Sequence, residues 1–233
     1  MKFVVAKEVF TKLESVCFGI VVARGIKKNA QSTEIAELLT NSIKNVEARF
    51  DSTKVKEAGE IGAYREAFTK LGINPNKFMS SIEAMATRIA KKKGFPQINS
   101  IVDLGNAISL KYLVPLGAHD LDDASGDISV RFSNQGDRFL PFGETQEEVL
   151  EQGELIYSVG DQVKTRRWIW RQSEQGKVNE NSKNIFFPID GFHEQNNLQV
   201  IAARDELASR LQQWFDCEIV VGLVDKQNRE LEF

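Results

Sequence analysis

Hydrophobic and polar residues alternate along this chain with two different periods, which divide it into predicted helices and strands. A period of three to four residues, typical of amphipathic helices, runs through positions 35–50, 61–71, 82–89 and 198–215. Consecutive or alternating apolar residues predict strands over Lys2–Val5, Val16–Arg24, Ile128–Phe132, Leu155–Val159, Phe186–Ile189 and Glu218–Val224.

Few strand–helix–strand units repeat in this order. The pattern therefore favours an α+β fold, with mixed β-sheets and helices packed against them, over a doubly wound fold. At 233 residues the chain is long enough to bury a core, and no repeat or low-complexity linker divides it. The sequence predicts one domain over residues 1–233.

The third of these helices has a clear start and a cationic end. Ser80 and Glu83 have the spacing of a capping box, so we expect Glu83 to cap its own helix and not to face the functional pocket. Lys91, Lys92 and Lys93 close the same segment. Cations stabilise a helix C-terminus, but such a cluster can also contact phosphates, and both interpretations stay open.

The stretch Val102–Asp122 combines a helix with a polar loop. Apolar side chains recur once per turn in its first half, and Pro115 then prevents the helix from continuing. The loop that follows carries His119 and carboxylates such as Asp120. Loops held by a rigid helix often bind ligands, although a buried helix followed by a polar turn is the simpler interpretation.

Composition is that of an ordinary globular protein, with 42% hydrophobic and 27% charged residues. The apolar run Val16–Ala23 is too short to span a bilayer, and the N-terminus lacks a signal-peptide pattern. We therefore expect a cytosolic protein with no membrane partner. Cys17 and Cys217 lie in apolar contexts, which predicts reduced and buried thiols.

The net charge of −3 is unevenly distributed. Residues 1–100 contain 17 Lys and Arg against 10 Asp and Glu, whereas residues 101–233 contain 13 against 23. The basic N-terminal part is a possible phosphate-facing surface, although a basic segment alone is weak evidence for nucleic acid.

The segment Arg166–Gln172 has the most unusual composition. On a single strand its alternate residues would share a face: Arg166, Trp168, Trp170 and Gln172 on one side, and Arg167, Ile169 and Arg171 on the other. Tryptophans flanked by guanidinium groups can stack on a ring and hold a phosphate or carboxylate. Alternatively, the tryptophans are buried and the arginines pair with nearby acidic residues.

Four short motifs follow one another: V-D-x-x-N at Val102–Asn106, P-L-x-A-x-D at Pro115–Asp120, G-x-I-x-V-R at Gly126–Arg131, and G-D-x-F at Gly136–Phe139. In this order they resemble the tRNA-editing module, the B-three/B-four domain, of the phenylalanyl-tRNA synthetase beta subunit. The resemblance implies an editing-domain-like fold. The rest of that large subunit has no counterpart here, so the chain looks like a free-standing relative and not a full tRNA ligase.

The chain departs from that family inside the expected pocket. The editing module has a histidine at the third position of its P-L-x-A motif, where this chain has Gly117 and carries His119 two residues later. The segment Arg166–Gln172 corresponds to one lining the family's pocket, and together with Lys177 it makes the expected pocket more cationic. Specificity for mischarged tyrosine does not carry over, and we expect the room opened at Gly117 to take a bulkier or anionic group.

The resemblance implies a protein that binds the acylated 3′ end of tRNA and hydrolyses wrong aminoacyl esters in trans. Asn106, His119 and Asp120 would orient the terminal ribose or a water molecule. The other expected contacts are substrate binding by Arg166, Arg167, Trp168, Trp170, Arg171, Gln172 and Lys177, and RNA binding by Lys91, Lys92 and Lys93.

We expect no metal and no cofactor, because the chain has no histidine cluster, Gly-rich phosphate loop or serine nucleophile motif. A positioned water with oxyanion donors can hydrolyse an activated aminoacyl ester. A general-base histidine has two candidates, His119 and His193, although a lone histidine is more often structural. The alternative is a non-catalytic module that binds an amino acid, nucleotide or peptide in the same pocket.

Overall fold

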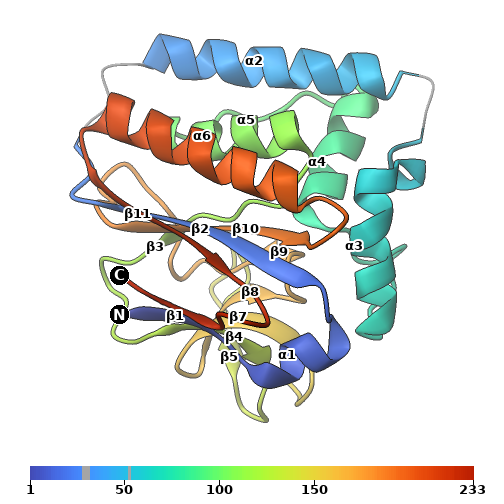
Figure 1. Ribbon diagram of the computed structural model, residues 1–233, viewed down its shortest axis with the longest axis vertical. Helices are drawn as coiled ribbons and strands as arrows, with labels where there is room; N and C mark the ends of the chain where they lie inside the picture. Colours follow the sequence, from blue (N-terminus) through green and yellow to red (C-terminus); the bar gives the residue numbers. More distant parts are fainter. Residues whose placement is uncertain (28–31, 52–53) are drawn as a thin grey trace.

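The computed structural model describes residues 1–27, 32–51 and 54–233. This part of the chain forms two β-sheets with a group of helices over one of them (Figure 1). The helices lie above the smaller sheet, the larger sheet lies below it, and the two chain termini lie side by side at the edge of the larger sheet.

The smaller sheet has the strand order β11 (Glu218–Val224), β2 (Val16–Arg24), β10 (Ile185–Phe192) and β3 (His119–Asp120), with all neighbours antiparallel. The two inner strands β2 and β10 are buried along almost their whole length. Helices cover one face of this sheet and the larger sheet covers the other. This double burial explains why both strands read as continuous apolar runs.

The larger sheet has the order β12 (Glu230–Glu232), β1 (Lys2–Val5), β4 (Ile128–Phe132), β7 (Leu155–Val159), β8 (Gln162–Arg166), β5 (Arg138–Phe139) and β6 (Glu148–Val149), and β9 (Arg171–Gln172) pairs with β8. The pairs β1–β4 and β5–β8 are parallel, whereas the other pairs are antiparallel. The predicted α+β class with mixed sheets is confirmed.

The helices are α1 (Lys7–Lys12), α2 (Ser32–Arg49), α3 (Gly59–Lys70), α4 (Ser81–Ala90), α5 (Ser100–Tyr112) and α6 (Asn197–Phe215), with a short 3-10 helix η1 (Val55–Glu57). α6 packs on β2, β10 and β11, α5 packs on α6, and α2 packs on α5. α5 begins where the Asn99 side chain accepts a hydrogen bond from the backbone N–H of Val102 at 3.0 Å. No helix of the described part is long and apolar enough to cross a membrane.

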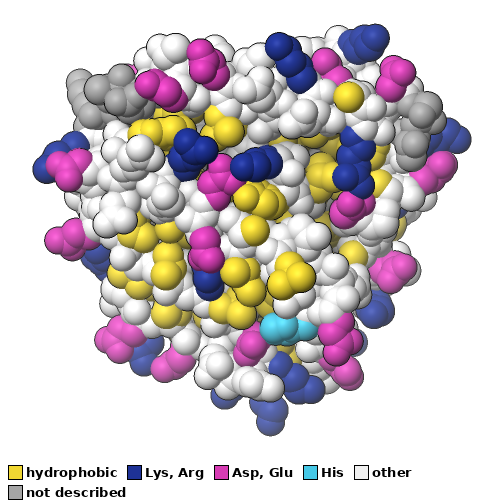
Figure 2. Space-filling model, turned by 45° about the horizontal axis from the view of Figure 1, so that its top comes forward, with side chains coloured by type: hydrophobic (Ala, Val, Ile, Leu, Met, Phe, Trp, Pro, Cys, Tyr) yellow, Lys and Arg dark blue, Asp and Glu magenta, His cyan; other side chains and the backbone are white. Residues whose placement is uncertain are grey.

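The basic N-terminal part does not form a separate half of the molecule. It supplies β2 at the centre of the smaller sheet and helices on several sides. Lys and Arg are interspersed with Asp and Glu over the face shown in Figure 2. Cys17 is buried and Cys217 is half-buried, both thiols are free, and burial raises their pKa to about 12 and about 11.

Two differences from the predicted strands shape the site. β8 ends at Arg166 and β9 begins at Arg171, so the expected single strand over Arg166–Gln172 is wrong. Arg167 and Trp168 have φ angles of 47° and 58°, in the left-handed region that a regular strand excludes. β10 is longer than the predicted strand Phe186–Ile189, and it accommodates Pro188 inside it because the neighbouring β3 pairs only with Ile185 and Phe186.

An ion pair joins two of the sequence motifs. Arg131 in β4 donates hydrogen bonds to both carboxylate oxygens of Asp137, at 2.6 and 3.0 Å, and one to the carbonyl of Gly160 at 2.7 Å. Asp137 also accepts from the backbone N–H of Asn134 at 2.8 Å, and its side chain is 4% exposed. Arg131 and Asp137, one from each motif, therefore both have a structural role in the larger sheet.

Two glycines let α6 approach the smaller sheet closely. An ideal Cβ at Gly191 in β10 would lie 2.3 Å from Cγ2 of Val200 and 2.8 Å from Oδ1 of Asn196. An ideal Cβ at Gly19 in β2 would lie 2.8 Å from Cγ1 of Val200. A side chain at either position would displace the helix, because β-branched Val200 has little rotamer freedom with which to yield.

We predict that Gly191→Ala destabilises the protein and that Gly62→Ala does not. Overpacking against Val200 costs about 1–3 kcal/mol. Alanine at Gly62 in α3 would have nothing within 4 Å, and it should add about 0.4–1 kcal/mol by restricting the unfolded chain. Urea unfolding measures both changes. Equal stability of the two variants would show that the fold does not require the close approach of α6.

Candidate functional site

A pocket of about 80 Å³ lies between the loop that precedes β3 and the turn between β8 and β9. We call it the Asp190 pocket. The residues that matter for its chemistry come from four separate parts of the chain: Gly117 and His119, Tyr157, Trp168 and Arg171, and Asp190. The structure thus brings the 117–120 loop and the 166–172 segment to one cavity.

Asp190 lies inside β10 and is 2% exposed. Its Oδ1 accepts hydrogen bonds from the Tyr157 hydroxyl at 2.7 Å and from the indole N–H of Trp168 at 2.6 Å. Its Oδ2 has no hydrogen bond from any described residue. Burial raises the pKa of Asp190 to about 7, and the two hydrogen bonds oppose this shift. A carboxyl group with this pKa can both accept and donate a proton near neutral pH.

His119 lies in β3 with its ring among aromatic side chains and is 4% exposed. Its centroid is 6.0 Å from that of Tyr157, in a stacked arrangement, and 6.2 Å from that of Phe186. Nδ1 is buried and has no hydrogen-bond partner among the described residues. Burial, and then the charge of Lys164, lower the pKa of His119 to about 4, so the imidazole is neutral at pH 7.

Gly117 does not open the free space that was expected. An ideal Cβ there would lie 3.2 Å from Cγ of Pro188 and 3.3 Å from Nε2 of His119. The expectation of room for a bulky or anionic group is therefore wrong, because the ring of His119 and the ring of Pro188 already occupy it. A glycine at this position lets the histidine ring lie against the backbone.

Arg171 and Gln172 reach the Asp190 pocket, as does Trp170. Gln172 donates a hydrogen bond to the carbonyl of Ala118 at 2.6 Å, which ties β9 to the 117–120 loop. The Arg171 Nη2 atom lies 3.5 Å from the carbonyl oxygen of Phe142, and Arg171 forms no ion pair within the described ranges. Arg171 thus brings a positive charge to the pocket that no carboxylate of the described residues neutralises.

The other two arginines of this segment are structural. Arg166 donates a hydrogen bond to Glu154 at 2.8 Å. The guanidinium of Arg167 lies 4.0 Å from the ring centroid of Phe78 and 4.6 Å from that of Trp170, and 3.5 Å from Glu154. Neither arginine lines the pocket, because the left-handed turn directs them away from the strand face on which they were expected.

Three more predicted residues lie off the pocket. Lys177 pairs with Glu174 at 3.1 Å. Asp120 accepts hydrogen bonds from the Ser182 hydroxyl and, at 2.8 Å, from the backbone N–H of Asp122, so it organises its own loop. The half-buried Asn106 lies on α5. None of these three is part of the pocket lining, and their predicted roles gain no support from the geometry.

The lysine cluster lies beyond the end of α4. That helix ends at Ala90, and Lys91, Lys92 and Lys93 are exposed after it, outside the Asp190 pocket. The described residues form no ion pair with any of the three. They are therefore available to phosphates, and this prediction stays open.

The prediction for Glu83 is confirmed in one part and wrong in the other. Ser80 is the N-cap of α4, since its Oγ accepts a hydrogen bond from the backbone N–H of Glu83 at 3.3 Å. The Glu83 side chain forms an ion pair with Arg65 at 2.6 Å and lines a second pocket. Glu83 does not line the Asp190 pocket, as predicted. The expectation that its side chain caps α4 is wrong, because the carboxylate pairs with Arg65 instead.

His193, the second candidate histidine, lies beside Asp225. The His193 Nε2 and Asp225 Oδ2 atoms lie 3.1 Å apart, and His193 does not line the Asp190 pocket. Within residues 1–27, 32–51 and 54–233, no group of three or more His, Cys, Asp or Glu side chains is placed to hold a metal ion.

The sequence analysis missed Asp190 and Tyr157. A signal for Asp190 exists, because it is the only charged residue in the apolar run Ile185–Phe192. A carboxylate inside a buried strand needs hydrogen-bond donors from other elements and is a candidate for a shifted pKa. Tyr157 carries no such signal, because tyrosine is common in ordinary strands.

Comparison with known proteins adds a family and a fold. Residues 63–226 match the model of the B3/4 domain family. The chain is 28% identical over 128 residues to the phenylalanine–tRNA ligase beta subunit of Fusobacterium nucleatum, covering 54% of this chain and 15% of that protein. It is 28% identical over 142 residues to the corresponding Staphylococcus aureus subunit, covering 58% of this chain and 17% of that protein.

A solved structure has the same fold. It is an N-terminal fragment of the phenylalanyl-tRNA synthetase beta subunit from Pyrococcus horikoshii, with a TM-score of 0.50 and 11% identity, matched over 93% of this chain and 49% of that chain. The matches to the two curated subunits span only 15% and 17% of their length.

The shifted pKa values of Asp190 and His119 predict opposing effects of pH on stability. Folding raises the pKa of Asp190 from 3.8 to about 7, so its contribution falls as pH rises between these values. Folding lowers the pKa of His119 from 6.5 to about 4, so its contribution is lost as pH falls through the same range. Each slope is about 1.4 kcal/mol per pH unit, and the two nearly cancel between about pH 4 and 6.5.

Urea unfolding from pH 4 to 7 tests this cancellation. In Asp190→Asn the stability should rise with pH, because only His119 still titrates. In His119→Gln it should fall with rising pH, because only Asp190 does. If both variants keep the wild-type slope, these two groups are not the source of the pH dependence.

Proposed function

The chain belongs to the B3/4 domain family, and on this basis we propose that it binds the acylated 3′ end of a tRNA and hydrolyses the aminoacyl ester in trans. The observation that carries the proposal is the Asp190 carboxylate. Its pKa is near neutral, one oxygen is fixed by Tyr157 and Trp168, and the other accepts no hydrogen bond from the described residues. Relationship to a tRNA synthetase subunit supports a tRNA-related partner.

In the proposed reaction Asp190 removes a proton from a water molecule while the water oxygen attacks the ester carbonyl carbon. The bond between that carbon and the ribose oxygen then breaks, and the ribose oxygen leaves with the proton. Neutral His119, on the same pocket wall, orients the water. Arg171 supplies positive charge for the developing oxyanion or for the terminal phosphate.

The size of the Asp190 pocket limits the aminoacyl group. Its volume of about 80 Å³ is well below the roughly 300–1,000 Å³ of pockets that enclose a drug-sized ligand. The pocket admits the ester, a water and a small side chain, while the tRNA end stays outside. We therefore propose that esters of small amino acids are hydrolysed faster than aromatic ones.

We predict that Asp190→Asn lowers hydrolysis of the best aminoacyl-tRNA by about 10²–10⁴-fold, the usual contribution of a general base. A panel of aminoacylated tRNAs identifies that substrate, and release of the free amino acid is the measurement. Asp205→Asn is the matched control, because this carboxylate is 57% exposed on α6 and pairs with its neighbour Arg204.

Two outcomes would contradict this proposal. If wild-type protein binds aminoacyl-tRNA but hydrolyses none of the panel, the domain is a non-catalytic binding module. If Asp190→Asn retains full activity, a group other than Asp190 is the base.

The lysine cluster predicts how tRNA binding responds to salt. Replacing Lys91, Lys92 and Lys93 with Gln should weaken binding and reduce the slope of log affinity against log salt. The reduction should be about 0.7 for each phosphate that is no longer neutralised on a single strand, or about 0.9 on a duplex. Stability should change little because all three side chains are exposed. Filter binding at several salt concentrations provides the slope, and an unchanged slope would exclude these lysines from the RNA interface.

A further inference from the structure

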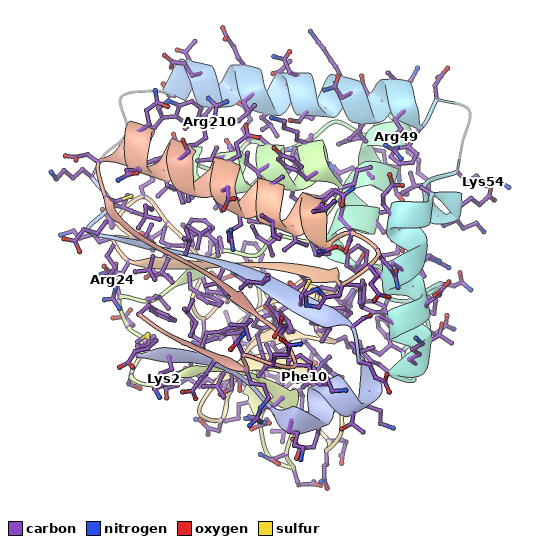
Figure 3. All side chains as sticks on the ribbon, in the orientation of Figure 1. Lys2, Phe10, Arg24, Arg49, Lys54 and Arg210 are labelled. Atoms are coloured by element: carbon purple, nitrogen blue, oxygen red, sulfur yellow. The ribbon has the colours of Figure 1, made fainter. Side chains whose placement is uncertain are left out.

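The strand β11 lies at one end of the smaller sheet and, among the described strands, pairs with β2 alone. In Figure 1 it lies in front of β2, with no other element drawn over it. It runs antiparallel to β2 from Glu218, opposite Arg24, to Val224, opposite Phe18. Arg24 is labelled in Figure 3 and marks the end at which β11 begins. We call the side of β11 that faces away from β2 the β11 edge.

The hydrogen bonds of β10 show which backbone groups point out of the β11 edge. In antiparallel sheets the N–H and C=O groups of successive residues point alternately to the two sides of the strand. The carbonyl of Pro188 accepts from the N–H of Gly117 at 2.9 Å, on the side of β10 opposite β2. Ile20, opposite Pro188, therefore directs its groups to β11, where it faces Gly222. The residues whose groups point outward are then Ile219, Val221 and Leu223.

These three residues present a row of backbone donors and acceptors to solvent. Within the described ranges, none of them forms a hydrogen bond with any element beyond β2. The Val221 residue is 46% exposed, and Ile219 and Leu223 are half-buried. Such a row is a template on which another strand can pair.

The other strands at the sheet ends have features that protect an edge from pairing. β3 and β6 have two residues each, and β12 has three, of which Glu230 and Glu232 are charged. β11 has seven residues, of which Glu218 alone is charged, and it contains no lysine or proline. Short length, charge and proline are the usual protection of an edge. Among the described strands at sheet ends, β11 alone is both long and apolar.

We propose that the β11 edge pairs with the same edge of a second copy of this chain, antiparallel and around a two-fold axis at Val221. In this register Val221 lies opposite the partner's Val221, and Ile219 lies opposite the partner's Leu223. Each outward-facing residue then exchanges its N–H and C=O groups with the residue opposite. The two smaller sheets become one continuous sheet, and the interface has the two-fold symmetry that is commonest among oligomers.

The sequence of β11 is complementary to itself in this register, which favours a second copy over an unrelated strand. The apolar side chains of the three outward-facing residues lie on one face and pair with one another across the axis. On the opposite face, Gly222 lies opposite the partner's Val220, where Leu231 of the same chain already fills the space at the glycine. Glu218 lies opposite the partner's Val224, so no like charges face each other within the paired strands.

The helix that covers the smaller sheet leaves room for this pairing. α6 packs on β10, β2 and β11, with β2 between the other two strands. Neighbouring strands lie about 4.8 Å apart, so the β2 strands of the two copies would be about 14 Å apart across the joined sheet. Two α6 helices at that spacing are farther apart than the roughly 8–10 Å of packed helices. They therefore do not collide.

The first test is the mass of the wild-type protein in solution, measured by analytical ultracentrifugation over a range of concentrations. We expect a dimer that dissociates on dilution. A protein that stays monomeric at high concentration would overturn the proposal and leave the β11 edge to a strand of another protein.

Val221→Lys tests the position of the axis. It would place two ammonium groups opposite each other at the centre of the pair, so we expect the dimer to be weakened about tenfold or more. Val149→Lys is the matched control, because Val149 is 67% exposed on the short strand β6, and it should keep the wild-type affinity. If Val221→Lys dimerises as tightly as the wild type, β11 is not the interface.

A charge pair keeps this test independent of folding defects. Val221→Glu alone should also be weakened, whereas an equimolar mixture of Val221→Lys and Val221→Glu should form a mixed dimer, because the two-fold axis places the opposite charges together. Restored dimers show that both variants are folded. If the mixture associates no better than either variant alone, Val221 does not lie opposite its own copy and the proposed register is wrong.

Hydrogen exchange of the backbone amides reads the β11 edge directly. In the dimer the N–H groups of Ile219, Val221 and Leu223 should exchange slowly, and they should lose this protection on dilution to the monomer. If these three amides exchange rapidly in a dimeric sample, another surface joins the two copies and the proposal fails.

Discussion

The buried carboxylate of Asp190 is the constraint on which the arrangement of the two sheets depends. Tyr157 from the larger sheet and Trp168 from the β8–β9 turn donate to its Oδ1, and Tyr64 from α3 donates to its backbone carbonyl at 2.8 Å. Asn196, the N-cap residue of α6, donates to the Tyr64 hydroxyl at 2.7 Å. A buried carboxylate without donors is costly, so these elements can pack only in positions that satisfy it.

The same constraint explains the strained turn beside it. Arg167 and Trp168 adopt left-handed backbone conformations that cost of order 1–3 kcal/mol each and persist only where the surroundings fix them. Here the backbone N–H of Trp168 donates to the carbonyl of Leu155 at 2.6 Å, and that of Arg167 to Glu154 at 3.1 Å. The turn brings the indole N–H onto Asp190 and leaves Arg171 at the pocket.

The resemblance to synthetase beta subunits is one of family and fold. The chemistry of the Asp190 pocket is set by the residues of this chain that line it. Gly117 lets the ring of His119 occupy the space beside it, and two buried groups with pKa values near 7 and 4 lie on one small cavity. Burial disfavours an ionised His119 at neutral pH, whereas a carboxylate base with a neutral imidazole beside it is compatible with these values.

The sequence by itself determined the α+β class, the family, most helices and strands, and the candidate segments around His119 and Arg171, because periodicity and short motifs are local properties. It also suggested two alternatives for the arginines, of which the structure supports pairing for Arg166 and Arg167. Local pattern could not reveal that Arg167 and Trp168 leave the strand, since that turn is fixed by contacts with β7 and β10.

Only the tertiary structure decided which side chains face a cavity and with what acidity. Asp190 becomes a candidate base because two sheets enclose it, and Glu83 leaves an oxygen unpaired among the described residues because α3 and α4 meet around it. Desolvation and donor geometry depend on atoms contributed by distant segments, so no stretch of sequence contains them. The sequence determines which ionisable side chains the protein has. The packing of distant segments determines their burial and hydrogen-bond partners, and these set their pKa values.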